Sequence, residues 1–145
     1  MDNILSDFQL QEHKIPKLSI HIGSLSSEAQ IKLNSYFANC NVYYLNDEWS
    51  GNVMLGLRSV PETEENDLSS MFEIVIVGCF TCKGENTEDA KKDFTNHLQL
   101  NGAATLIPLA RAALQTASSL MGYHNQCLIP NINVYKLKWN RKGDE

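Results

Sequence analysis

The sequence predicts a protein of the α+β class with an antiparallel sheet. Strand-like segments fill the first part of the chain and helical segments follow them, which is the order typical of this class. Apolar and polar residues alternate in residues 18–22, as they do on a half-buried strand. In residues 106–121, apolar residues instead recur every three or four positions, as they do on one face of a helix.

The first strand is predicted over residues 8–22. Pro16 lies in its middle and cannot donate a hydrogen bond to a neighbouring strand, so it indicates either an edge strand or a bulge. Residues 28–36 fit either a short helix or an ordered crossover. Residues 42–45 are predicted to be extended, and Asn46-Asp47 after them favours a turn.

Two further strands are predicted over residues 52–60 and 71–82, with an acidic loop between them. Residues 74–77 are apolar at both odd and even positions. We therefore expect both faces of this strand to be covered, by helix on one side and by another subunit as the candidate for the other.

Thr87 is the expected N-cap of a helix that runs toward Leu98, and Asn101-Gly102 is expected to break it. A second, longer helix follows and ends at Gly122, a residue suited to a left-handed C-cap. Its expected apolar face comprises Leu106, Leu109, Ala110, Ala113, Leu114, Ala117, Leu120 and Met121. Arg111, Gln115 and Ser118 are expected on the opposite side.

Composition limits the classes of function. The 145 residues fit one domain spanning 1–145, and 43% hydrophobic with 20% charged residues is a globular composition. The net charge of -5 argues against non-specific nucleic-acid binding. No apolar run is long enough to span a membrane, and the polar start MDNILSDF does not resemble a secretory signal. We therefore expect a cytoplasmic protein without membrane insertion, whose cysteines are reduced.

Cys79-Phe80-Thr81-Cys82 is a CxxC motif, which is found in redox enzymes and zinc sites. Residues three apart on a strand point to opposite faces, so we interpret this pair as structural cysteines, and a small redox or zinc protein remains the weaker alternative. The histidines and serines show no catalytic spacing. The sequence accordingly predicts no enzyme, no catalytic residue, no metal site and no cofactor.

Five aromatic residues crowd a short region and are the candidate lining of a groove for unfolded apolar segments. An ordinary place in the core is the alternative for them. They are Tyr36, Phe37, Tyr43, Tyr44 and Trp49.

Several motifs resemble the SecB family of protein-export chaperones. Residues 106–111 (LIPLAR) resemble the family's proline, then an aromatic or aliphatic residue, then Ala-Arg within a helix. Gly122 and residues 128–134 (LIPNINV) resemble its Gly followed by Leu-Ala-Pro-Val-Asn-Phe. Residues 8–11, 18–20, 72–74 and 78–80 resemble parts of its strands. The similarity spans most of the chain.

The resemblance implies a four-stranded antiparallel sheet with two C-terminal helices packed on one face. It also implies an ATP-independent holdase that binds unfolded or precursor polypeptides in apolar grooves, without a cofactor. Family members are tetramers assembled through their long helices. We therefore expect a homo-oligomer, most simply a tetramer, with Ala110, Ala113 and Ala117 at its interface; a monomer whose helix only covers its own sheet is the alternative.

The resemblance also marks a departure from the family. Family members use acidic side chains on the open face of the sheet to dock the export motor SecA; Glu73 matches one of them, but Lys17 and His21 replace two others. Since charge complementarity governs partner choice, a SecB-like chaperone for a dedicated client such as an antitoxin is the close alternative to an export role. An internal partner for Glu73, such as Lys17 or His21, is the alternative to docking.

Overall fold

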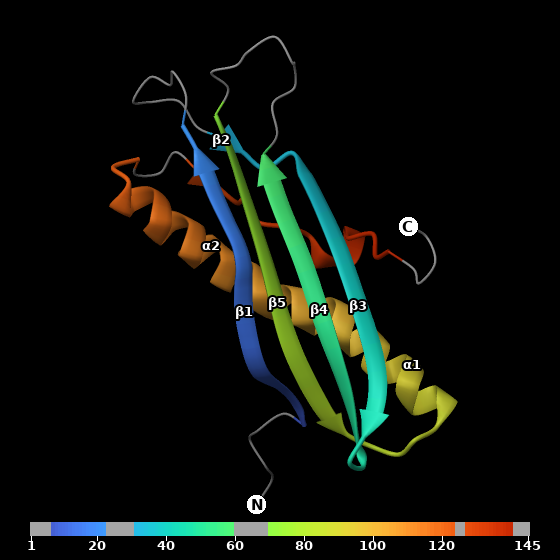
Figure 1. Ribbon diagram of the computed structural model, residues 1–145. Coiled ribbons are helices and arrows are strands. Elements are labelled where there is room, and N and C mark those ends of the chain that lie inside the picture. Colours follow the sequence, from blue (N-terminus) through green and yellow to red (C-terminus); the bar gives the residue numbers. More distant parts are fainter. Residues whose placement is uncertain (1–6, 23–30, 60–69, 124–126, 141–145) are drawn as a thin grey trace, which may run out of the picture.

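The computed structural model describes residues 7–22, 31–59, 70–123 and 127–140. In these ranges, four antiparallel strands form one sheet in the order β1-β5-β4-β3, with the helices on one side of it (Figure 1). The strands are β1 (Phe8–His21), β3 (Ser35–Leu45), β4 (Glu48–Ser59) and β5 (Met71–Lys83). The predicted class, α+β with a four-stranded antiparallel sheet, is confirmed.

The edge strand β1 carries both features that Pro16 indicates. Among the described strands it pairs only with β5, and its register against β5 shifts between Leu10 and Glu12 and again between Lys14 and Lys17. The second shift spans Pro16, which has no N–H to donate to β5.

A two-residue turn joins β3 to β4. Asn46 and Asp47 adopt positive φ angles of 54° and 63°, the conformation of a type I′ hairpin turn, which Asn and Asp tolerate better than most residues. The predicted turn is confirmed, and the strand before it begins earlier than the sequence indicates, at Ser35. Residues 31–32 form a short strand, β2 (Ile31–Lys32), parallel to β6 (Cys127–Leu128), so the described part of 28–36 contains no helix.

The helical part differs from the expected pair of separate helices. α1 (Glu88–His97), a π-helical turn (Leu98–Gly102) and α2 (Ala103–Leu120) form one continuous run. Gly102 does not break the helix, because it is buried: a Cβ atom there would lie 3.0 Å from Val53 Cγ2. Glycine at this position allows the helix to approach the sheet closely rather than to end.

Both predicted helix caps are confirmed. The Thr87 hydroxyl accepts a hydrogen bond of 3.1 Å from the Ala90 N–H. At the other end, Gly122 has a φ of 89°, and the N–H groups of Tyr123 and Gly122 donate to the carbonyls of Ser118 and Ser119. These two bonds form a Schellman motif.

The core lies between the sheet and α2. Alternate residues of β4 and β5 pack against Leu106, Ala110 and Leu114 of the helix. Ser118 continues this buried stripe, which corrects its expected place on the polar side: it lies four residues after Leu114, and its hydroxyl donates to the Gln115 carbonyl. Leu120, expected on the apolar face, is 84% exposed.

After β6 the chain returns along the helix side of the sheet, and Asn140, the last described residue, lies beside β3 (Figure 1). We call residues 129–140 the C-terminal segment; it contains one short 3-10 turn, Val134–Lys136.

Candidate functional site

The outer edge of β3 carries backbone groups that do not pair with the backbone of any other described residue. Asn140 N–H donates to the Ala38 carbonyl at 2.9 Å, so the backbone groups of Ala38 point away from β4. Alternate residues of a strand repeat this direction. Cys40, Val42 and Tyr44 therefore present their N–H and C=O groups outward. No backbone hydrogen bond from another described residue reaches these groups.

The aromatic residues of β3 flank this edge from both faces of the sheet. Tyr36 and Tyr44 share the helix side with the core, since they pair in register with Leu57 and Trp49. Phe37 and Tyr43 lie on the opposite face, because adjacent residues of a strand alternate in direction. The five predicted groove residues thus do not line one groove. Four of them border one edge.

Trp49, the fifth predicted groove residue, belongs to the core. It is buried on β4, its indole N–H donates to the Glu85 carbonyl at 2.9 Å, and its ring centroid lies 5.0 Å from that of Tyr44. The Tyr44 hydroxyl donates to the Gly84 carbonyl at 2.9 Å. Trp49 and Tyr44 therefore anchor the loop that precedes α1, while the backbone edge of Tyr44 stays free.

The C-terminal segment covers the other end of the β3 edge. Lys138 N–H donates to the Tyr36 hydroxyl at 2.9 Å, next to the bond between Asn140 and Ala38. Arg111 of α2 holds the start of the segment, because its Nε and Nη2 atoms donate to the carbonyls of Ile129 and Pro130, each at 2.9 Å. The sequence placed Arg111 away from the core but gave no indication of its partners.

A pocket of about 310 Å³, open to solvent, lies between α2 and the C-terminal segment. It is lined mainly by apolar atoms of the helix and of the segment. Its lining residues are Ala104, Ile107, Pro108, Arg111, Asn131, Ile132 and Val134.

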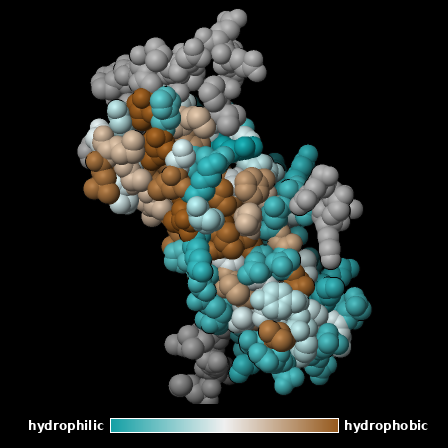
Figure 2. All heavy atoms as spheres, viewed as in Figure 1, coloured by the Kyte–Doolittle hydropathy of each residue, from teal (hydrophilic) through white to brown (hydrophobic). Residues whose placement is uncertain are grey.

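The sheet face opposite the helices, here called the open face, is apolar along its centre. Figure 2 shows apolar surface over the middle of this face, with hydrophilic surface beside it. Val77 of β5 and Met54 of β4 pair in register there and line a hollow of about 330 Å³ together with polar residues of β3 and β4. Helix covers one face of β5, the strand that contains residues 74–77, as expected (Figure 1). No described element covers its other face.

Glu73 lies on the open face with only 13% of its side chain exposed. Its carboxylate forms an ion pair with Lys17, and its second oxygen lies 3.7 Å from Arg58 Nη1. The structure therefore gives Glu73 an internal partner, one of the alternatives that the sequence left open. His21 lies on the same face, in register with Met71. Arg58 was missed, because only the strand register reveals that it lies opposite Glu73.

The three alanines predicted for an oligomer interface differ in exposure. Ala110 is fully buried against the sheet of its own chain, whereas Ala113 is half-buried on the flank of α2. Ala117 is half-buried as well. Beyond them, Leu120 and Met121 are exposed at the end of the helix.

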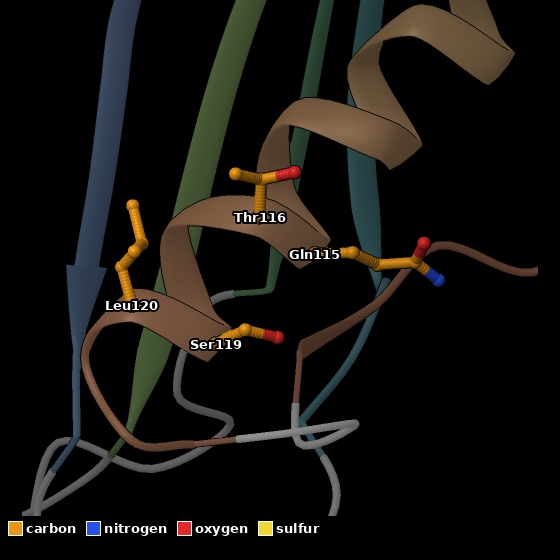
Figure 3. A pocket seen from close by; sticks show the side chains of 4 residues that line it. All are labelled: Gln115, Thr116, Ser119 and Leu120. Atoms are coloured by element: carbon orange, nitrogen blue, oxygen red, sulfur yellow. The ribbon is translucent and has the colours of Figure 1, made fainter.

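The surface at this end of α2 is hollowed. Figure 3 shows Thr116 and Leu120 projecting to one side of the helix and Gln115 and Ser119 to another, as expected for pairs four residues apart. The hollow they line measures about 450 Å³.

The two thiols of the CxxC motif point to opposite faces, as predicted. Cys79 pairs in register with Asn52 on the open face, and Cys82 pairs with Trp49 on the helix side. Burial raises the pKa of Cys82, and the carboxylates of Asp7 and Glu48 raise it further, which disfavours the reactive thiolate. Within the described ranges, no three His, Cys, Asp or Glu residues are grouped so that they could hold a metal ion.

The helices of the described ranges are too short or too polar to cross a lipid bilayer.

No protein-family model matches the sequence, and no curated protein is significantly similar to it. Among solved structures, the fold is similar to that of a SecB-like chaperone. This is Rv1957 of Mycobacterium tuberculosis, solved in complex with a ChAD peptide from the Rv1956 HigA1 antitoxin. The sequences are 10% identical, the TM-score is 0.48, and the match covers 87% of this chain and 91% of that one.

Proposed function

We propose that this protein is an ATP-independent holdase of the SecB-like kind, which binds unfolded polypeptides and keeps them from aggregating. The observation that carries the proposal is the outer edge of β3. An extended client segment can add to this edge as a further strand, using the outward groups of Cys40, Val42 and Tyr44. Tyr36 and Tyr43 beside the edge supply apolar contacts, one on each face, whereas the Phe37 ring lies over Gly56 of β4.

Strand addition suits a binder of many sequences, because every polypeptide has the same backbone. Six backbone hydrogen bonds at a net contribution of about 1 kcal/mol each give about 6 kcal/mol. Association of two molecules costs about 4–15 kcal/mol. Backbone bonds alone therefore do not hold a client, and apolar contacts with the aromatic side chains must supply the difference. Such contacts favour breadth over specificity.

The test is suppression of aggregation, followed by light scattering, with a variant that removes one outward donor. Val42→Pro lacks the outward N–H, and its missing donor leaves the ladder to β4 intact. Val42→Ala shortens the same side chain but keeps the N–H. We expect wild type and Val42→Ala to suppress aggregation at stoichiometric amounts and Val42→Pro to require several-fold more protein. Absence of suppression by the wild type would reject the proposal.

The resemblance to SecB offers two settings for this activity: protein export with the motor SecA, or service to a dedicated client such as an antitoxin. The pairing of Glu73 with Lys17 and Arg58 favours the second setting, because docking through Glu73 would require its carboxylate to leave two cations. We propose a cytoplasmic homo-oligomer, most simply a tetramer, in which Ala113, Ala117 and Leu120 of α2 face another subunit.

No catalytic or redox role is proposed, since the two thiols of the CxxC motif face opposite sides of the sheet.

A further inference from the structure

The C-terminal segment contacts the rest of the protein in the way that a bound peptide does. Its four polar contacts to β3 and α2 all use its own backbone: the carbonyls of Ile129 and Pro130, and the N–H groups of Lys138 and Asn140. None of these contacts depends on the identity of the side chain that the segment offers. A site of this kind can hold other extended sequences.

Four apolar side chains in the second part of the segment face the core. Ile132, Val134, Leu137 and Trp139 pack against the core, at intervals of two and three residues. The residues between them, such as Asn133 and Lys138, are exposed. The two-residue steps are those of an extended chain that buries one side, and the 3-10 turn Val134–Lys136 accounts for the three-residue step from Val134 to Leu137.

The fit of the segment to α2 is incomplete. A pocket of about 310 Å³, open to solvent, lies between α2 and the segment at Ile132 and Val134, so these two side chains leave part of the surface of α2 uncovered. Atoms around such a space lose contacts that a bulkier occupant would make. A client with larger side chains at these two positions would therefore fill space that the segment leaves empty.

The segment also shares an edge with the proposed client site. Asn140 uses the Ala38 carbonyl, and two residues further along β3 the outward groups of Cys40 and Val42 remain free. A client strand that binds the free part and extends along β3 reaches Ala38 and Tyr36 next. It can proceed only if the segment leaves.

We infer that residues 129–140 occupy one half of the client site as an internal competitor, and that clients are segments with bulky apolar residues at the same two- and three-residue spacing. This inference rests on the proposed function. A tethered competitor acts at a high effective concentration. The apparent Kd for a client therefore equals the Kd of the empty site divided by the fraction of molecules in which the segment has left the site. Only clients that fill the site better than the segment displace it.

The experiment uses a fluorescein-labelled peptide with the sequence of residues 129–140 (IPNINVYKLKWN), added to the full-length protein. Lys138→Pro removes the N–H that donates to Tyr36, and the ψ of 134° at Leu137 suits a following proline. Lys138→Ala keeps that N–H and is the matched control. Asn140→Pro with Asn140→Ala repeats the comparison at the bond to Ala38, in case one proline variant does not fold.

Loss of one hydrogen bond, at about 0.5–1.5 kcal/mol, should loosen the segment. We expect the proline variants to bind the labelled peptide about two- to tenfold more tightly than the wild type, and the alanine variants to match the wild type. A peptide with Ile132, Val134, Leu137 and Trp139 replaced by serine should not bind.

Equal affinity of folded proline variants and wild type, or binding of the serine peptide, would overturn the inference. If the wild type suppresses aggregation while no variant binds the peptide, the inference fails and the holdase proposal stands. If the protein neither binds the peptide nor suppresses aggregation, both fail.

Discussion

Glu73 is a carboxylate on an otherwise apolar strand, and its surroundings explain how it is tolerated there. Removal of a charge from water is costly unless the charge is paired. Lys17 from β1 and Arg58 from β4 supply two positive charges from the strands on either side of β5. The two ion pairs of Glu73 therefore link β1 and β4 to β5, the strand between them.

Reversal of this charge tests the pairing. Glu73→Lys places a third cation beside Lys17 and Arg58, and we expect it to lower the free energy of unfolding by about 3–5 kcal/mol, the cost of breaking a buried pair, or somewhat less because Lys17 is exposed. Lys17→Glu in the same chain should restore part of the loss. Chemical denaturation measures both. An unchanged stability for Glu73→Lys, together with lost binding to purified SecA, would instead assign Glu73 to docking.

At the scale of elements, the continuous helix depends on a close approach to the sheet at Gly102. Helix propensity favours alanine over glycine by about 1 kcal/mol. Overpacking of a buried position costs about 1–3 kcal/mol, and the Cβ atom would meet Val53, which is fully buried on β4. The steric term should exceed the gain in propensity.

We therefore expect Gly102→Ala to destabilise the protein by about 1 kcal/mol net, as measured by the shift of its thermal or denaturant midpoint. Asn101→Ala, at the exposed position beside it, is the control and should change stability little. Stabilisation by Gly102→Ala would show that the helix does not need this close approach.

The sequence predicted those elements whose signals are local. The Asn46-Asp47 turn, the Thr87 N-cap and the Gly122 C-cap each depend on residues next to one another, so one stretch of sequence contains the whole cause. Gly102 was misread because the reason for a glycine there is Val53, about fifty positions away. The burial of Ser118 was missed because its side chain is polar, although its position four residues after Leu114 places it on the same face of the helix.

The candidate site was predicted less well than the fold, because it depends on strand pairing. The aromatic residues near β3 were recognised, but their separation onto two faces follows only once the strand is known to begin at Ser35. The role of the C-terminal segment was also inaccessible, since its contacts with Arg111 and Tyr36 join positions 18 to 102 residues apart. Such pairings need the tertiary structure.

At the scale of the whole molecule, exposed apolar surface remains on two sides, the open face of the sheet and the end of α2. A large aliphatic side chain that is 84% exposed, as Leu120 is, favours burial against another subunit when it adjoins other apolar residues. Met121 is exposed beside it, and Ala117 lies one turn before.

We expect light scattering to find an oligomer at micromolar concentration, with a mass several times the 16.3 kDa of one chain. Leu120→Asp should shift the protein toward smaller species, because a charge at an apolar interface is costly. Leu45→Asp, at an exposed position of the β3–β4 hairpin end, should not. A wild-type species of 16.3 kDa would remove the oligomer from the account.

Addition of a client strand to the outer edge of β3 should be visible by amide hydrogen exchange in the presence of an unfolded client. The N–H of Val42 points outward and should exchange rapidly in the free protein and slowly in the complex. Asn41 beside it is the internal control, because its N–H is directed toward Asn52 of β4 and is protected in both states. Protection of Val42 with no change at Asn41 is the predicted result. An unchanged exchange rate at Cys40, Val42 and Tyr44, under conditions in which the client is held in solution, would contradict the account.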